Sequence, residues 1–320
     1  TTVVEAALLD RAAVGCDVNP LSSVLTRPRL APPTLAQVSE RLRALDLSSG
    51  DGYREDLTVF FHPDTLHTIC GLRAYLRKRQ MAGAMDGVDE WIQMVAVNRL
   101  TGHSPGFFSV YTLPPNQAVS IVSQRKINAR RAQTPVARDV VRLIIKKSKS
   151  LLRDCGDATR RQLGTYRARH QLLVQGASKT PEIRSASVNL VVTSPPFLDV
   201  VNYASDNWLR CWFCGIDADG VPITMARKLD TWRAAMTDVF HELRRVLVPG
   251  GSVAFEVGEV RGGTIKLEET VIPCGHSVGL EPLAVVINAQ MFTKTANCWG
   301  ISNNRKGTNT NRIVIFRKPE

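Results

Sequence analysis

Residues 188–197 read VNLVVTSPPF, a short apolar run followed directly by a rigid turn. The apolar run is typical of a buried strand in a parallel sheet. The two prolines fix the backbone and remove two N–H donors, so the turn presents a hydroxyl and carbonyls, which are acceptors. Open α/β sheets bind their ligands at the carboxyl ends of strands. The stretch therefore predicts a ligand site at a strand end, although a plain Pro-Pro turn with a core phenylalanine also fits these residues.

Similar apolar runs occur toward both ends of the chain. A long helix is predicted for residues 231–247, and Pro249-Gly250-Gly251 would stop it. Strands that alternate with helices predict an α/β fold with a parallel, doubly wound, Rossmann-like sheet. The other predicted strands cover residues 12–16, 172–175, 252–257, 283–289 and 311–316.

Residues 34–166 have a different pattern, whose apolar periodicity is mostly helical. Because predicted strands flank this segment, it is interpreted as an insertion into the sheet domain. Within it, residues 98–116 form a loop rich in glycine, proline and aromatic residues. Contact with DNA or with the rim of the active site is one interpretation of this loop, and a structured connection between helices is the other. Helices are predicted at 35–45, 63–78, 89–100 and 135–152.

The net charge of +12 is concentrated in one part of the chain. Residues 121–170 hold fourteen Lys and Arg against three acidic residues. A polyanionic partner, with DNA as the leading case, explains such a cluster. A solvated helical face is the alternative. The candidate DNA contacts in this segment are Arg130, Arg131, Lys146, Lys147 and Lys149.

Composition excludes several other classes of protein. No apolar run approaches the roughly 20 residues of a membrane helix, and the first residues do not resemble a signal peptide. The seven cysteines have no framework spacing, which favours a reducing cytoplasm. Cys211 and Cys214 are expected to be buried thiols on a core helix, so no metal site is predicted.

The turn at 194–197 has the groups needed to hold an exocyclic amine. Such an amine donates two hydrogens, which Ser194 and the carbonyl of Pro195 could accept. Phe197 could stack on the attached ring, while Pro196 keeps the turn rigid. Accepting both hydrogens makes the amine lone pair less conjugated with the ring and more nucleophilic.

Ser194-Pro195-Pro196-Phe197 after an apolar strand resembles the catalytic motif of amino-methylating DNA methyltransferases. The resemblance implies S-adenosylmethionine as cofactor and a base in DNA that is flipped out of the stack. The serine form is typical of cytosine-N4 enzymes, so cytosine N4 is the expected target. Adenine-N6 methylation and RNA base methylation stay open, and a restriction endonuclease could accompany the protein.

Thr1-Thr2-Val3-Val4-Glu5-Ala6 resembles the continuation of that family's glycine-rich cofactor loop. Asp17 matches the acid that accepts hydrogen bonds from the cofactor ribose. Because the glycines and the first strand are absent from these 320 residues, the chain alone is expected not to be a competent enzyme. The candidate cofactor-binding residues are Thr1, Thr2, Asp17, Asn19 and Thr193.

One segment departs from the family pattern. Where the family usually has Gly-Asp-Ser, this chain has Gly176-Ala177-Ser178, so an important adenine-binding carboxylate is missing. A nucleic-acid-binding protein on an inactive methyltransferase scaffold therefore stays open. The implied division is a cofactor part at 1–30, a helical target-recognition insert at 31–171 and a catalytic part at 172–320.

Residues 293–312 are rich in Asn, Thr, Lys and Arg. In the class I methyltransferase fold, the seventh strand runs antiparallel to the sixth, so the loop between them emerges at the catalytic edge. Such side chains commonly bind phosphates and base edges. The candidate DNA contacts here are Lys294, Asn304, Arg305, Lys306 and Arg312.

Overall fold

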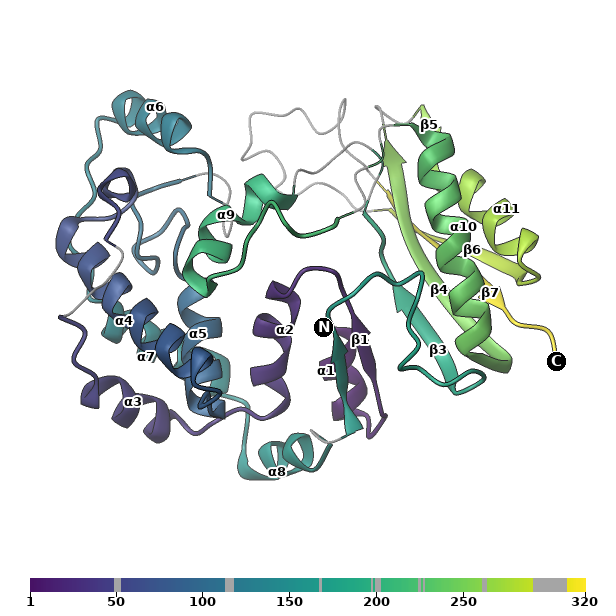
Figure 1. Cartoon of the computed structure of the whole chain (residues 1–320), viewed down its shortest axis with the longest axis horizontal. Helices are drawn as coiled ribbons and strands as arrows, with labels where there is room; N and C mark the ends of the chain where they lie inside the picture. The colour runs from purple at the N-terminus through teal and green to yellow at the C-terminus, as the bar shows by residue number, and fades with distance from the viewer. Residues whose placement is uncertain are drawn as a thin grey trace. The chain divides into compact units, whose positions relative to one another are not determined.

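The computed structural model describes residues 1–48, 53–112, 118–166, 169–196, 198, 203–223, 226, 228–260, 264–289 and 310–320. The chain divides into two compact units, which are drawn together in Figure 1. The first unit comprises Thr1–Val174 and Tyr203–Val221, and the second comprises Gln175–Asn202 and Pro222–Glu320.

The second unit is built on a sheet with the strand order β3-β4-β7-β6. β3 (Val188–Thr193) runs parallel to β4 (Leu247–Val260), and β7 (Thr310–Arg317) is antiparallel to both β4 and β6 (Glu281–Ala289). A short strand, β5 (Ile265–Lys266), pairs with the end of β4. The predicted Rossmann-like α/β class, with an antiparallel last strand, is confirmed.

Two helices, α10 (Leu229–Val246) and α11 (Leu267–Ser277), share one core with this sheet. Alternate residues of β4 and β7 point into that core, and Phe240 of α10 stacks on Phe255 with ring centroids 4.7 Å apart. α11 approaches the sheet closely at Gly275, where an added Cβ would lie 2.4 Å from the ring of Phe316. Helix α11 therefore needs glycine at this position.

The first unit contains a pair of parallel strands that come from distant parts of the chain. β1 (Val14–Cys16) pairs with β2 (Gln171–Leu173), and Val14 lies opposite Gln171. The predicted burial is wrong for β1, where Val14 is 39% exposed, and for β3, where Leu190 is 60% and Val192 is 50% exposed. Within the described residues β1 and β2 each pair along one edge only, so neither is enclosed as an inner strand would be.

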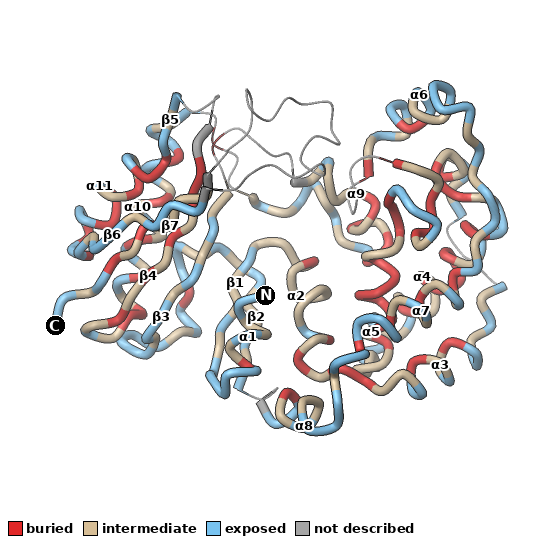
Figure 2. The backbone as a smooth tube through the Cα atoms, turned by 180° about the vertical axis from the view of Figure 1, so that it is seen from behind, coloured by how far each residue is buried: buried red, intermediate tan, exposed pale blue. Residues whose placement is uncertain are grey.

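The rest of the first unit is helical, as predicted. Its largest core forms around α5, and Figure 2 shows the buried backbone concentrated there. α7 begins at Val140, five residues later than predicted, because Asp139 caps its N-terminus. The elements are α1 (Thr2–Leu8), α2 (Leu21–Thr26), η1 (Arg27–Leu30), α3 (Leu35–Ala44), η2 (Glu55–Val59), α4 (Pro63–Met81), α5 (Gly87–Val97), α6 (Ile121–Arg131), α7 (Val140–Leu152), α8 (Asp157–Tyr166) and α9 (Tyr203–Cys214).

Helix α9 follows the Ser-Pro-Pro turn in sequence but packs into the core of the first unit. Leu209, Phe213 and Cys214 are buried there, and Trp208 Nε1 donates a hydrogen bond of 3.1 Å to the carbonyl of Ala118. Cys211 is buried as well, so both cysteines are core thiols, as expected. None of the described helices combines the length and apolar character that a membrane span requires.

Candidate functional site

The turn that ends β3 is held in place by a tryptophan of α10. Trp232 is buried, and its Nε1 donates a hydrogen bond of 2.9 Å to the carbonyl oxygen of Pro196. Thr193 is the last residue of β3 and lies opposite Phe255 of β4. The two prolines contribute no N–H donor to the turn, and this hydrogen bond fixes it from α10 through a carbonyl.

Ser194 is exposed at this turn, while Pro195 and Pro196 are half-buried. The turn thus presents an accessible hydroxyl next to the backbone carbonyl of Pro195, at the carboxyl end of a parallel strand. Two neighbouring acceptors match the two hydrogens of an exocyclic amine. Phe197, the expected stacking residue, lies outside the described residues.

Asp17 lies directly after β1 in the first unit, as the sequence predicted. Its backbone N–H donates to the carbonyl of Leu173, which fixes it beside β2. One carboxylate oxygen, Oδ1, accepts a hydrogen bond of 2.8 Å from the backbone N–H of Asn19. Because the residue is exposed, the second oxygen is accessible to a ligand diol. This geometry fits the carboxylate that the ribose of S-adenosylmethionine would require.

Of the other predicted cofactor contacts, Thr193 ends β3, while Thr1, Thr2 and Asn19 lie at the starts of α1 and α2. Asn19 Oδ1 accepts a hydrogen bond of 3.0 Å from Leu21 N, the first residue of α2. Thr1 precedes α1, and its carbonyl accepts hydrogen bonds from Val4 and Glu5. Thr1 and Thr2 are exposed. The structure places Asn19 in a local structural role, while a cofactor role for Thr1 and Thr2 stays a prediction.

The segment that follows Ala177 is tied to α10 by hydrogen bonds to an ion pair within that helix. Glu242 accepts hydrogen bonds of 2.6 Å from the backbone N–H and hydroxyl of Thr180 and pairs with Arg245. The hydrogen bond from Arg245 is the main reason that the pKa of Glu242 falls to about 2. Arg245 also donates to the carbonyls of Thr180 and Ile183. Residues 180–183 are therefore fixed, although the family's aspartate is missing from this loop.

The predicted DNA contacts at 121–170 fall on two separate helices. α6 packs against η2, whereas α7 packs against α3, α4 and α5. Figures 1 and 2 both show α6 at one end of the helical unit and α3 at the other, with α7 between them. The basic residues thus form two surfaces. Arg130 and Arg131 are exposed on α6, Lys146 and Lys149 are exposed on α7, and Lys147 of α7 is half-buried.

The loop after α5 is an ordered structure within its described part, residues 98–112. Phe108 N donates to the carbonyl of Arg99, and Val110 N donates to the carbonyl of Phe60. Gln124 and Gln133 each donate a hydrogen bond of 3.0 Å to the carbonyl of Tyr111. These bonds fix the loop on the helical core, and His103 and Ser104 stay exposed at its tip.

The second group of predicted DNA contacts is described only at Arg312. This residue lies in β7, and its Nη1 donates a hydrogen bond of 2.7 Å to Glu268 at the start of α11. Both side chains are nearly buried. Lys294, Asn304, Arg305 and Lys306 lie outside the described residues. Arg312 is thus engaged within the fold at the strand end.

Sequence reasoning missed the residues that support the site. Trp232 had no signal beyond its place in an amphipathic helix, since its partner lies 36 positions away. The spacing of Glu242 and Arg245 is a recognisable i,i+3 pair, but the sequence does not reveal Thr180 as their shared partner. Among the described residues, no cluster of His, Cys, Asp and Glu has the geometry of a metal site.

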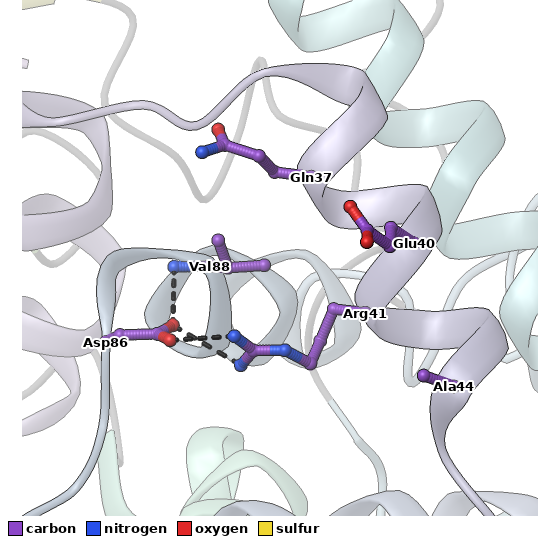
Figure 3. Close-up of a pocket in the computed structure, with 6 residues that line it drawn as sticks. All are labelled: Gln37, Glu40, Arg41, Ala44, Asp86 and Val88. Atoms are coloured by element: carbon purple, nitrogen blue, oxygen red, sulfur yellow. Dashed lines mark hydrogen bonds and ion pairs between the residues drawn. The ribbon is translucent and has the colours of Figure 1, made fainter.

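Figure 3 shows a pocket between α3 and the start of α5, with a volume of about 410 Å³. Arg41 in its wall pairs with Asp86, which also caps α5 through Val88 N. Arg41 and Arg79 both bind the buried Asp89. These charges neutralise one another inside the fold, so the pocket is a by-product of a structural network. Gln37, Glu40 and Ala44 complete its lining.

Neither a family model nor a curated protein matches the sequence. Among solved structures, the chain is similar to a Thermus thermophilus protein that carries the provisional description DNA modification methylase. The identity is 24%, the match covers 43% of this chain and 47% of that one, and the TM-score is 0.27. The chain thus spans about half the length of that protein.

Two further solved structures are more distant in sequence. An S-adenosylmethionine-dependent methyltransferase from Methanosarcina mazei is 12% identical over 52% of this chain and 80% of its own, with a TM-score of 0.28. A 16S rRNA (adenine(1408)-N(1))-methyltransferase from Catenulisporales acidiphilia is 11% identical over 51% and 72%, with a TM-score of 0.29.

Proposed function

We propose that the protein transfers a methyl group from S-adenosylmethionine to the exocyclic amino group of a base in DNA, with cytosine N4 as the leading target. The observation that carries this proposal is the turn of Ser194, Pro195 and Pro196 at the carboxyl end of β3. An exposed hydroxyl and a proline carbonyl form a pair of acceptors there. The indole N–H of Trp232 fixes the turn by its hydrogen bond to the carbonyl of Pro196.

In this proposal the chain supplies position and electrostatics. Ser194 and the Pro195 carbonyl accept the amine hydrogens, and Phe197 stacks on the flipped base. Because both hydrogens are bonded, the amine nitrogen is more nucleophilic and is held in one orientation. S-Adenosylmethionine would supply the methyl group, and the free oxygen of Asp17 would accept hydrogen bonds from its ribose.

DNA is favoured as the substrate by the separate basic surfaces on α6 and α7. Cations on two faces of the helical unit could contact phosphates at different positions along a duplex. These contacts would fix the register of the protein, while base readout would come from other residues. RNA remains the second polyanion to test.

The test is a methylation assay with the protein expressed from its complete gene. Methylation-free plasmid DNA and total RNA are each incubated with labelled S-adenosylmethionine, digested to nucleosides and analysed by mass spectrometry. N4-methyldeoxycytidine is expected. N6-methyladenine would move the target to adenine, and labelled RNA alone would replace the DNA substrate.

The missing aspartate at Ala177 favours one competing function, a nucleic-acid-binding protein without activity. Titration of S-adenosylmethionine distinguishes the two functions. DNA binding without cofactor binding or methylated product would establish the inactive scaffold. Cofactor binding that is lost in Asp17→Ala would support the enzyme.

A further inference from the structure

Leu198 lies just beyond the Ser-Pro-Pro turn and is only 1% exposed. Its side chain belongs to the same buried cluster as Trp232 and Phe255, which is the core that the sheet shares with α10 and α11. The chain thus buries a large apolar side chain four residues after the exposed hydroxyl of Ser194. This burial connects the accessible end of β3 to the core of the second unit.

The turn is held at its first end by the sheet. Thr193, the residue before Ser194, lies opposite Phe255 in the parallel ladder of β3 and β4. Phe255 is fully buried, and its ring stacks on that of Phe240 with centroids 4.7 Å apart. Because such close-packed cores resist deformation, the chain enters the turn from a fixed position.

Two different contacts hold the turn beyond that point. Pro196 contributes a carbonyl, which accepts the indole N–H of Trp232, and Leu198 contributes an apolar side chain, which is packed in the core. Trp232 is itself fixed in the first turn of α10, since its backbone N–H donates to the carbonyl of Lys228 over 3.1 Å. A polar and an apolar contact, two residues apart, therefore act on the same stretch of backbone.

The place of Leu198 along the chain shows why the apolar contact matters. Residues 203–221 belong to the first unit, where α9 packs into a separate core. Leu198 is the last described residue before the chain passes to that unit. Among the described residues, the hydrogen bond from Trp232 would be the remaining contact to fix this end of the turn if the leucine side chain were removed.

We propose that Leu198 is a positioning residue for methyl transfer, whose buried side chain holds the turn so that the Ser194 hydroxyl and the Pro195 carbonyl keep one orientation. Catalysis by positioning is sensitive to small displacements, and a shift of about 1 Å can lower the rate on the order of 100-fold. The catalytic purpose of this anchor rests on the proposed function, whereas the coupling between Leu198 and the turn does not.

The first test measures the anchor without any substrate. In protein expressed from its complete gene with isotope-labelled tryptophan, NMR follows the exchange of each indole N–H in heavy water, and Trp232→Phe identifies the Trp232 signal. Leu198→Ala should make this N–H exchange on the order of tenfold faster, because the turn opens more often. The indole of Trp91, which donates to Ser148 in the first unit, should exchange as in wild type.

Leu280→Ala is the matched control for this variant. Leu280 is also 1% exposed and belongs to the same buried cluster, but it lies between α11 and β6. Its loss should lower the stability of the protein to a similar extent and leave the exchange of the Trp232 N–H nearly unchanged. Leu198→Met conserves most of the side-chain volume and should keep the exchange slow.

The second test measures methylation by the same variants. Leu198→Ala should lower kcat on the order of tenfold and leave the affinity for S-adenosylmethionine nearly unchanged, because the turn faces the base. Leu280→Ala and Leu198→Met should keep kcat close to that of wild type. Combined with Trp232→Phe, Leu198→Ala should lower kcat by less than the product of the two separate effects, since both residues hold the same turn.

The two tests together separate the possible failures. Faster exchange with a lower kcat in Leu198→Ala, but not in Leu280→Ala, supports the proposal. An equal response of the two variants, or unchanged exchange in Leu198→Ala, would show that Leu198 is an ordinary core residue. Faster exchange with unchanged kcat would mean that the anchor does not position the reacting groups. If the wild-type protein methylates no nucleic acid, the proposed function fails, and the exchange rates alone decide whether Leu198 holds the turn.

Discussion

Trp232 Nε1 and the carbonyl oxygen of Pro196 form a hydrogen bond of 2.9 Å between a buried helix residue and the turn at the end of β3. The indole N–H is the only hydrogen-bond donor of the tryptophan side chain, and it binds the carbonyl of this turn. The bond fixes the second proline, so the neighbouring carbonyl of Pro195 keeps its direction.

Replacing Trp232 with phenylalanine should therefore lower turnover more than it lowers binding of S-adenosylmethionine. A displaced turn should lower kcat on the order of 10- to 100-fold, and the unpaired carbonyl should cost about 1–3 kcal/mol of unfolding free energy. Steady-state methylation, cofactor titration and thermal unfolding measure the three quantities.

Trp91→Phe is the matched control for that variant. Trp91 is also buried, and it loses an indole hydrogen bond of 3.0 Å, in this case to the hydroxyl of Ser148 in the first unit. It should lose similar stability but keep kcat. An equal fall in kcat for both variants would mean that Trp232 acts only through general stability.

Ser194→Ala and Phe197→Ala test the proposed contacts with the base. Both should reduce turnover on the order of 100-fold while leaving the affinity for the cofactor nearly unchanged, because these groups contact the base. Parallel measurements of methylation rate and cofactor dissociation constant decide this. Equal losses in the two quantities would show that the roles are assigned wrongly.

The two basic helices can be tested separately by salt titration of DNA binding. Neutralising Arg130 and Arg131 tests α6, and neutralising Lys146 and Lys149 tests α7. Each lost phosphate contact should flatten the slope by roughly 0.9 log unit. If only one pair changes the slope, the other helix is a solvated face and the duplex runs along one side of the unit.

The lowered pKa of Glu242 predicts that the folded protein loses stability in acid. Its pKa in the folded protein, about 2, lies below the ordinary value of 4.5. Its stabilising contribution is thus complete above about pH 4.5 and is lost as pH falls toward 2. Glu242→Gln should lower stability at neutral pH by about 1–3 kcal/mol and should weaken this part of the acid dependence. Unfolding by urea at pH 7, 4 and 3 provides the comparison.

The sequence predicted where strands occur, but not all of their bounds: β4 begins at Leu247, five residues earlier than predicted, and includes Pro249-Gly250-Gly251. β3 begins and ends at the predicted residues, because an apolar run and two prolines define both ends. Helix α11 was not predicted, since Pro273 and Gly275 interrupt its helical pattern. Only the folded structure shows that Gly275 is required by the ring of Phe316.

The candidate site residues also differ in whether local sequence or tertiary contacts reveal them. Asp17 and the Ser-Pro-Pro turn lie at strand ends, which local sequence can identify. Trp232 was missed because its importance depends on a distant partner, Pro196. Tertiary contacts of this kind leave no periodicity or motif in a single sequence.

The position of α9 limits how this protein can be divided for study. The first unit is completed by residues 203–221, which return to it after the Ser-Pro-Pro turn. A fragment that stops before α9, for example at Val174, would lack Leu209 and Phe213 from its core and the Trp208 bond to Ala118. Neither unit is therefore encoded by one continuous stretch, and a fragment that keeps the core of the helical unit must extend to Val221 and so carry residues 175–202 of the other unit with it.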